Sequence, residues 1–293
     1  MKPAPFEYFA PTTLDEALAL LAQHGDAAKV LAGGQSLVPM MNFRLVTPSI
    51  LIDLNRVAEL DYLREHASGL AIGAMTRQRK LERDPWVARH APLIAETIPF
   101  VAHPQIRNRG TLGGSLAHAD PAAELPAVAI ATSATLKVKS VKSERWIEAQ
   151  NFFTGLFSTA LAPDELLVEI ALPPMPPRAG YSFQETSRRH GDYALAGVAC
   201  LVALDEQGAC RDARLVFLGL GAQPIAARAA KQLIGAAPTP DAIRAVAQAI
   251  DAEIDPGSDI HASAEFRRHL AKVLTRRALE KAVERVRDSE TRD

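Results

Sequence analysis

The first fifth of the chain alternates between short apolar runs and one amphipathic stretch. Thr13 and Glu16 form a capping box, and the apolar residues that follow recur every three or four positions, which predicts a helix that Gly25 ends. Short apolar runs predict strands, and a segment with two methionines predicts a helical turn. We expect strands at residues 6–9, 29–32 and 49–54 and the helical turn at 37–44.

The rest of the chain shows the same two periodicities in a different order. Alternating or continuous apolar runs predict strands at residues 69–73, 134–140, 166–172, 181–185, 198–204 and 215–218. Apolar residues at helical spacing predict helices at residues 77–83, 92–98, 122–131, 227–234 and 241–250, and a long one from Ala264 whose end, 284–293, should fray. Prolines at 173, 174, 176 and 177 interrupt the pattern and predict a domain boundary.

Length and charge narrow the class of protein. At 293 residues the chain is longer than one hydrophobic core usually supports, and we expect three units, at residues 1–57, 58–175 and 176–293. Lys and Arg number 33 against 34 Asp and Glu, so the net charge of -1 gives no general attraction to nucleic acid or to an anionic membrane. The longest apolar run, 194–204, is too short to span a bilayer, and residues 1–5 lack an apolar signal core. We expect a cytoplasmic location.

The residues that most often carry catalysis or bind metals are scattered. Cys200 and Cys210 are too few to hold a four-thiolate iron–sulfur cluster within this chain, and we expect Cys200 to be a small core residue and Cys210 a residue at the end of a strand. The sequence contains no HxH, HExxH or CxxC spacing, so we expect no metal site. Ser36 and Ser115 do not lie in a GxSxG elbow, which argues against a serine hydrolase. We assign no catalytic residue.

Two stretches with paired glycines carry the strongest functional signal. We call residues 32–36, Ala-Gly-Gly-Gln-Ser, the first glycine motif, and residues 110–115, Gly-Thr-Leu-Gly-Gly-Ser, the second glycine motif. Paired glycines let the backbone turn through positive φ and admit a phosphate close to the main chain. A lone Gly-Gly pair is usually only a turn, but two such cradles suit a ligand with two phosphates. The absence of GxGxxG and GxxxxGK[ST] argues against a nicotinamide-type Rossmann site and an ATP-binding phosphate loop.

These motifs and their neighbours resemble a known family. Residues 29–37 and 106–114 resemble the FAD-binding medium subunit of the molybdenum hydroxylases, the group that contains carbon monoxide dehydrogenase and xanthine dehydrogenase. Residues 187–194 and 258–263 are similar to the C-terminal domain of that family. The resemblance covers nearly the whole chain and implies an α+β fold. It implies a two-part FAD-binding domain of the PCMH type, followed by a C-terminal domain with a three-stranded antiparallel sheet and a helical bundle.

The resemblance also implies which residues bind FAD. They lie in and beside the two glycine motifs and at a few later positions: Lys29, Val30, Leu31, Ala32, Gly33, Gly34, Gln35, Ser36, Leu37, Val101, Thr111, Gly113, Gly114, Ser115, Ala117, Glu124, Leu167, Gln184 and Tyr193. At Glu124, an acidic residue of related flavoproteins contacts FAD, whereas Asp120 suits the start of a helix on structural grounds alone. Gln184 departs from the family pattern, because some relatives have a lysine there. Tyr193 is expected near the isoalloxazine ring.

The function that the resemblance implies is electron transfer within a three-subunit enzyme. A large subunit would carry the molybdenum cofactor and oxidise the substrate, and a small subunit would carry two [2Fe–2S] clusters. This chain would pass electrons through FAD to an external acceptor, and two such heterotrimers would form a dimer. Two alternatives stay open. One is a self-sufficient flavin oxidase or reductase with its own organic substrate, and the other is a non-catalytic nucleotide-binding or assembly subunit.

Overall fold

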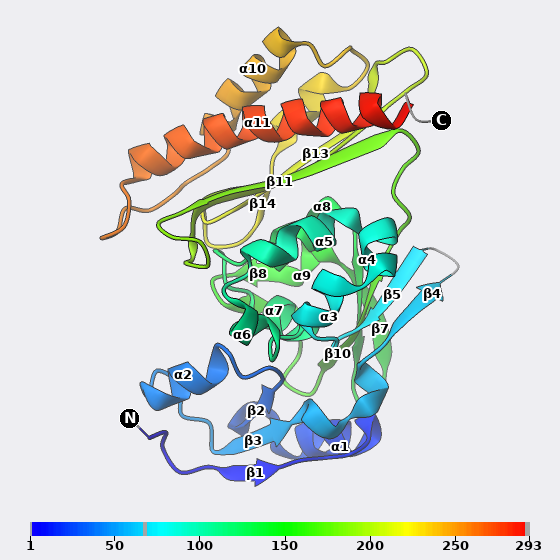
Figure 1. The fold of residues 1–293 in the computed structure, drawn as a ribbon. Helices are drawn as coiled ribbons and strands as arrows, with labels where there is room; N and C mark the ends of the chain where they lie inside the picture. The colour runs from blue at the N-terminus through cyan, green and yellow to red at the C-terminus, as the bar shows by residue number, and fades with distance from the viewer. Residues whose placement is uncertain (1, 67–68, 291–293) are drawn as a thin grey trace.

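The computed structural model describes residues 2–66 and 69–290. They form three units that lie one above the other in Figure 1. The first unit has a parallel sheet, the second a larger antiparallel sheet, and the third an antiparallel sheet with two long helices on one face. The α+β class expected from the sequence is confirmed.

The first unit is a three-stranded parallel sheet in the order β1-β3-β2. Its elements are β1 (Glu7–Phe9), α1 (Leu14–His24), β2 (Ala28–Leu31), α2 (Leu37–Asn42) and β3 (Ile50–Asp53). Thr13 caps α1, because its side chain accepts a hydrogen bond from the Glu16 backbone N–H at 3.2 Å. The apolar face of α1 enters the core of this unit through Ala17, Leu18 and Leu21. The order of elements predicted for this segment is confirmed.

The second unit is built on five antiparallel strands in the order β4-β5-β10-β6-β7. Its strands are β4 (Leu63–His66), β5 (Gly69–Gly73), β6 (Thr135–Lys139), β7 (Glu144–Glu148) and β10 (Leu166–Leu172), and a separate hairpin joins β8 (Phe153–Gly155) to β9 (Ser158–Thr159). Its helices are α3 (Gln78–Arg83), α4 (Pro85–His90), α5 (Pro92–Thr97), α6 (Pro104–Arg107), α7 (Leu112–His118), α8 (Glu124–Ala131) and α9 (Ala149–Phe152). β10 comes last in the chain yet lies in the middle of the sheet, and every residue in it is buried.

The third unit is a four-stranded antiparallel sheet in the order β11-β12-β13-β14. Its elements are β11 (Ala179–Ser187), β12 (Ala194–Leu204), β13 (Cys210–Leu218), β14 (Ile225–Ala226), α10 (Pro240–Ala249) and α11 (Ala264–Glu290). Short 3-10 helices complete the described chain at Gly25–Ala27, Leu54–Arg56, Ala58–Leu60, Ile98–Phe100, Arg228–Leu233 and Ile250–Ala252. The prediction of a three-stranded sheet was wrong, because the sheet has a fourth strand, β14. This strand pairs through only two residues and is too short to show an apolar alternation in the sequence.

Two helix predictions for the third unit need correction. Residues Arg228–Leu233 form a 3-10 helix instead of an α-helix, and the carboxylate of Glu253 accepts hydrogen bonds from the Arg228 and Ala229 backbone N–H groups, each at 2.7 Å. Helix α11 continues through Glu290, although residues 284–293 were expected to fray. Val283 and Val286 hold this end in the buried core of the third unit. Residues 291–293 lie outside the described residues.

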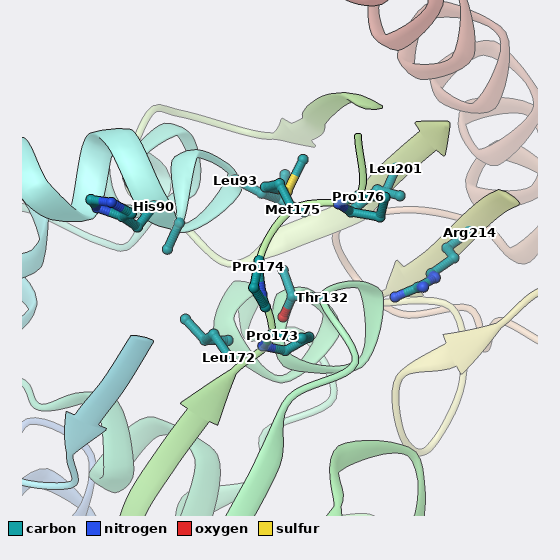
Figure 2. A pocket seen from close by; sticks show the side chains of 11 residues that line it. His90, Leu93, Thr132, Leu172, Pro173, Pro174, Met175, Pro176, Leu201 and Arg214 are labelled. Atoms are coloured by element: carbon teal, nitrogen blue, oxygen red, sulfur yellow. The ribbon is translucent and has the colours of Figure 1, made fainter. Parts of the chain in front are cut away.

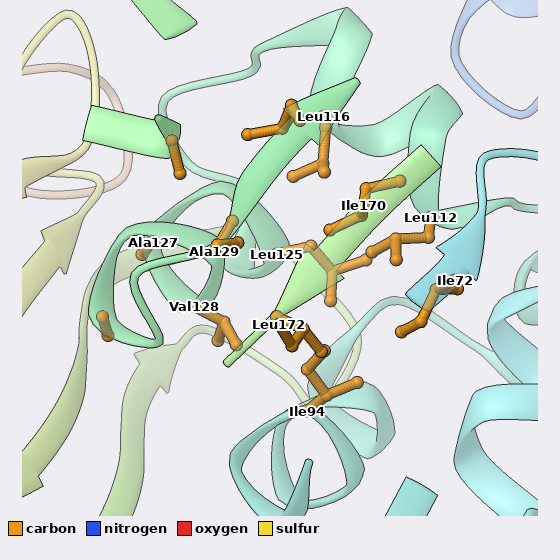
Figure 3. Packing of buried hydrophobic residues seen from close by; sticks show 14 of the residues in the cluster. Ile72, Ile94, Leu112, Leu116, Leu125, Ala127, Val128, Ala129, Ile170 and Leu172 are labelled. Carbon is orange, nitrogen blue, oxygen red and sulfur yellow. The ribbon is translucent and has the colours of Figure 1, made fainter. Parts of the chain in front are cut away.

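Helix α8 links the cores of the second and third units. It is apolar almost all round, as expected for a helix that is covered on every side. Figure 3 shows Leu125 and Val128 of α8 among Ile94, Ile170 and Leu172 of the second unit, and buried residues of β12 and β13 belong to the same cluster. The helix predicted at 122–131 begins only at Glu124, because the preceding residues form a turn.

An ion pair also joins these two units. The Glu96 carboxylate on α5 accepts a hydrogen bond from the Phe183 backbone N–H at 2.7 Å and pairs with Arg285 of α11 at 2.5 Å. Arg285 donates a second hydrogen bond to the Tyr181 carbonyl oxygen at 2.7 Å. The third unit is thereby fixed on the second by polar as well as apolar contacts. Among the described helices, none is both long and apolar enough to cross a membrane.

Candidate functional site

The two glycine motifs, separated by more than seventy residues in the sequence, touch each other in the structure. A Cβ atom placed on Gly33 would lie 2.5 Å from the carbonyl oxygen of Arg109 and 2.7 Å from the Cα atom of Gly110. A Cβ atom on Gly114 would lie 3.2 Å from the Cβ atom of Ala32. Side chains at Gly33 would prevent this approach, so glycine is required there for contact between the first and second units.

The first glycine motif is a loop between β2 and α2. Gly34 has a φ of 73°, a left-handed conformation that favours glycine. Within the described part of the chain, the backbone N–H groups of residues 33–36 donate to no protein acceptor, while the Gln35 side-chain amide donates to the Gly33 carbonyl oxygen at 2.9 Å. Successive free N–H groups in a tight turn form a concave anion-binding surface. The first glycine motif therefore leaves backbone N–H groups that could bind an anion, and its binding of phosphate stays a prediction.

The second glycine motif has a different conformation from the one expected. Gly113 and Gly114 lie in the first turn of α7 and do not adopt positive φ. Their N–H groups are already used, because Gly113 donates to the Ala74 carbonyl oxygen at 2.8 Å and Gly114 donates to the Thr111 hydroxyl at 3.0 Å. A Cβ atom on Gly113 would lie 2.5 Å from that of Ala74. The expected φ > 0 turn is wrong here, and these glycines serve close packing.

The remaining predicted residues lie in several environments. Most of them lie on elements that flank the two motifs in the chain: Lys29, Val30 and Leu31 in β2, Leu37 at the start of α2, and Ser115 and Ala117 in α7. Val101, after the 3-10 helix Ile98–Phe100, is buried in the core cluster of the second unit. Leu167 of β10 is only 3% exposed and belongs to the core cluster of the second unit. The Gln184 side-chain amide donates to the Ser182 hydroxyl at 3.0 Å. Tyr193 is 69% exposed and lies between β11 and β12.

Acidic side chains approach one another where the third unit meets the second. Burial, with a smaller contribution from the charge of Asp120, raises the pKa of Glu124, the first residue of α8, to about 7. Burial raises the pKa of Glu185, in β11, to about 8, and the charge of Glu124 contributes. The Glu185 Oε2 atom is buried and has no hydrogen-bond partner within the described chain.

Glu185 was missed by sequence reasoning, although it is next to the predicted Gln184. A lone glutamate in a strand usually faces solvent, and its burial depends on how β11 lies against the second unit. The unpaired Oε2 atom of Glu185 can accept a hydrogen bond from a hydroxyl group of a polar ligand. A protonated carboxyl group beside it can donate one. Glu185 and Glu124 therefore extend the candidate site from the glycine motifs toward the third unit.

The pockets lie outside the contact between the glycine motifs. Figure 2 shows an apolar pocket of about 110 Å³ where the proline-rich linker passes between the second and third units. Its walls include Leu93, Pro173, Pro174, Met175 and Leu201, and none of the predicted site residues lines it. A second, more polar cleft of about 270 Å³ lies between the first and second units and is lined by Leu54, Asn55, Val57, Ala58, Asp61, Met75 and Arg77.

The cysteines and possible metal ligands were also located. Cys200 is buried inside β12, and Cys210 is the buried first residue of β13, so the core and strand-end positions expected for them are confirmed. Burial raises the pKa of the Cys200 thiol and raises that of Cys210 to about 11, so both are protonated at neutral pH. Across residues 2–66 and 69–290, no group of three or more His, Cys, Asp or Glu side chains is placed to hold a metal ion.

Two family models match the chain almost end to end. The family described as "FAD binding domain in molybdopterin dehydrogenase" matches residues 4–175. The family described as "CO dehydrogenase flavoprotein C-terminal domain" matches residues 181–282. Both glycine motifs lie in the first match, and Gln184, Glu185 and Tyr193 lie in the second.

Individual proteins of this family are also similar to the chain over nearly its whole length. The chain is 44% identical to the 6-hydroxypseudooxynicotine dehydrogenase complex subunit alpha of Paenarthrobacter nicotinovorans, over 98% of this chain and 97% of that protein. It is 38% identical to the carbon monoxide dehydrogenase medium chain of Hydrogenophaga pseudoflava, over 96% of this chain and 98% of the relative. A solved structure of carbon monoxide dehydrogenase from that organism, lacking the Mo-pyranopterin moiety of the molybdenum cofactor, matches with a TM-score of 0.94 at 38% identity, covering 97% of this chain and 99% of that one.

Proposed function

Because the chain belongs to the family of FAD-binding medium subunits of carbon monoxide and xanthine dehydrogenases, we propose that it transfers electrons through FAD within a molybdenum hydroxylase complex. Its relatives are dehydrogenase subunits, and an FAD-binding domain makes up residues 4–175. The observation that carries the proposal is the contact between the two glycine motifs, with free backbone N–H groups in the first.

The residues at this contact fit FAD. The N–H groups of residues 33–36 suit phosphate oxygens, and the Ser36 and Ser115 hydroxyl groups lie in the two motifs. The carboxyl groups of Glu124 and Glu185 suit the hydroxyl groups of the ribityl chain. The residues predicted from the sequence, Tyr193 and Gln184 among them, stay our proposed contacts for the rest of the cofactor. When bound, FAD would supply reversible two-electron redox chemistry, and the chain would supply position and polarity.

We place the other redox centres on partner chains. Both cysteines are buried and protonated, so this chain offers no thiolates for a cluster. In the proposed complex, a small subunit carries [2Fe–2S] clusters that reduce FAD, and a large subunit carries the molybdenum cofactor and oxidises the substrate. This chain would hold the FAD through which electrons reach an external acceptor. We further propose that two heterotrimers form a dimer, that the units end near residues 57 and 175, and that the complex works in the cytoplasm.

Reconstitution of the purified chain tests this proposal. We expect one FAD per chain, released into the supernatant by acid precipitation because it is bound noncovalently. The flavin should be reduced by dithionite and reoxidised by an artificial acceptor, whereas oxidation of the organic substrate should need the small and large subunits. Substrate turnover by the isolated chain with FAD would favour a self-sufficient flavin oxidase. A chain that takes up no flavin would favour an assembly subunit.

A further inference from the structure

Hydrogen bonds from the side chains of Arg77 and Asn55 connect the two glycine motifs, and we call these two side chains the relay. Arg77 lies just before α3, and its guanidinium donates through Nη1 to the carbonyl oxygen of Arg109, the residue before the second motif. Its other nitrogen, Nη2, donates to Asn55 Oδ1 at 2.5 Å. Asn55 Nδ2 in turn donates to the carbonyl oxygen of Ala32, in the first motif, at 2.9 Å. Arg77 therefore connects the two motifs, the second through the Arg109 carbonyl oxygen and the first through Asn55.

The surrounding contacts fix both ends of this relay. The Gln78 backbone N–H donates to the Gly110 carbonyl oxygen at 2.9 Å, and Arg77 forms an isolated antiparallel bridge with Thr111. On the other side, Asp53 Oδ1 accepts from the Asn55 backbone N–H at 2.9 Å, and Tyr8 donates to Asp53 Oδ2 at 2.6 Å. The Arg109 carbonyl oxygen that Arg77 contacts is also the atom nearest to a Cβ placed on Gly33. The relay thus acts at the contact between the motifs.

We infer that Arg77 is a positioning residue that sets the spacing of the two glycine motifs and so prepares them to receive the pyrophosphate of FAD. This inference rests on the proposed function. The first and second units meet across this site, and any change in their separation moves the Ser115 hydroxyl of the second motif relative to the free backbone N–H groups of the first. A preformed spacing lowers the reorganisation that binding requires. Arginine suits the role because its rigid fork reaches two acceptors at once, which the single ammonium of lysine cannot do with the same geometry.

Comparison of FAD with FMN tests the inference directly. FMN has one phosphate and cannot bridge the motifs, so spacing matters to FAD alone. In Arg77→Lys we expect the Kd for FAD to rise about 10- to 100-fold, the effect of losing one or two charge-assisted hydrogen bonds, while the Kd for FMN changes little. The matched control is Arg145→Lys, because Arg145 makes a similar fork to Glu165 and the Ala160 carbonyl oxygen, far from both motifs in the sequence. Binding to apoprotein is measured by flavin fluorescence.

Two further measurements separate positioning from a general loss of structure. Asn55→Ala should also weaken FAD binding. The Kd for FAD of the double variant Asn55→Ala, Arg77→Lys should rise by less than the product of the two single increases, because both substitutions break the same chain of hydrogen bonds. In Arg77→Ala, guanidinium at low millimolar concentration should restore FAD affinity in part, since the cleft of about 270 Å³ beside Arg77 and Asn55 can admit it. Ammonium at the same concentration should restore less.

The outcomes are distinct. If the wild-type chain binds no FAD, the proposed function fails before any variant is measured. If the wild-type chain binds FAD and Arg77→Lys keeps the same ratio of FMN to FAD affinity, the positioning role is wrong. An equal loss of affinity for both flavins, together with a lower thermal midpoint of the apoprotein, would assign Arg77 a structural role only and would also overturn the inference.

Discussion

Gly33 lies directly against the backbone of Arg109, so close that a Cβ atom on Gly33 would stand 2.5 Å from the Arg109 carbonyl oxygen. That oxygen belongs to the main chain and cannot rotate away, so even alanine forces the first and second units apart. Gly33→Ala should therefore lower apoprotein stability by about 1–3 kcal/mol and also weaken FAD binding.

Thermal unfolding and flavin titration of the Gly33→Ala apoprotein check both parts of this prediction. Gly257→Ala is the matched control, because a Cβ atom on Gly257 would meet no atom within 4 Å. The structure changes the expectation that follows from a phosphate cradle alone, in which FAD loss would exceed loss of fold. A Gly33→Ala chain with wild-type stability would show that the two units do not meet as described.

Gly34 calls for a different substitution series. Its φ of 73° costs an ordinary side chain about 1–2 kcal/mol, and asparagine tolerates this conformation better than alanine does. We expect Gly34→Ala to lose more FAD affinity than Gly34→Asn, because the loop must leave the conformation that exposes its N–H groups. Equilibrium titration with FAD distinguishes the two variants. Equal losses would point to crowding by Leu31 and Val38 as the cause, since their side chains lie 3.1 and 3.2 Å from the added Cβ.

The carboxyl groups of Glu124, which is buried, and of Glu185, which is partly buried, predict how stability depends on pH. Burial raises the pKa of Glu124 to about 7 and that of Glu185 to about 8, whereas a glutamate carboxyl group of an unfolded chain has a pKa of about 4.3. Between these values the folded chain keeps protons that the unfolded chain has released. The raised pKa values of Glu124 and Glu185 therefore stabilise the folded chain fully below pH ~4.3, and this stabilisation is lost as the pH rises through the pKa values of the folded state.

Glu185→Gln tests this dependence, since glutamine stays neutral at every pH. The thermal midpoint of the wild-type apoprotein should fall from pH 5 to pH 8, and that of Glu185→Gln should fall less steeply over the same range. A change of 1 kcal/mol moves the midpoint by about 2–4 °C in a chain of this size. Parallel curves for the two proteins would contradict the assignment of a buried, protonated Glu185.

The ion pair between the second and third units gives a fourth prediction. Glu96→Ala leaves the Phe183 N–H group without an acceptor and Arg285 without its carboxylate partner, and we expect a loss of about 1–3 kcal/mol in the free energy of unfolding by denaturant. Glu144→Ala is the control, because Glu144 is a more exposed partner of Lys137 and should cost less than about 1 kcal/mol. Similar losses for both variants would mean that the Glu96 contact contributes no more than a surface pair.

The sequence predicted best where one pattern decides the structure. The capping box at Thr13 and the apolar spacing after it were enough to place α1, and the apolar residues of 166–172, interrupted only by Glu169, were enough to place β10. Strand β7 was missed because it is an edge strand in which only Ile147 is buried, so it shows no apolar alternation.

Long-range contacts explain what the sequence could not predict. Helix α7 contains Gly113 and Gly114, and glycine is a poor helix former. The helix forms there because Thr111 caps it and because its glycines let it approach Ala74 closely. The burial of Glu185 and the bond from Arg77 to Asn55 depend in the same way on residues far apart in the chain. Local periodicity holds no information about either.

The central place of β10 has a consequence for biosynthesis. Leu166 and Val168 complete the hydrophobic core of the first unit, while Leu167, Ile170 and Leu172 complete that of the second. A nascent chain therefore carries two unfinished cores until residue 172 has left the ribosome, and neither N-terminal unit can fold as it emerges. The slow step should be insertion of this late strand between β5 and β6, a contact of high sequence separation that ribosome stalling just before residue 166 would block.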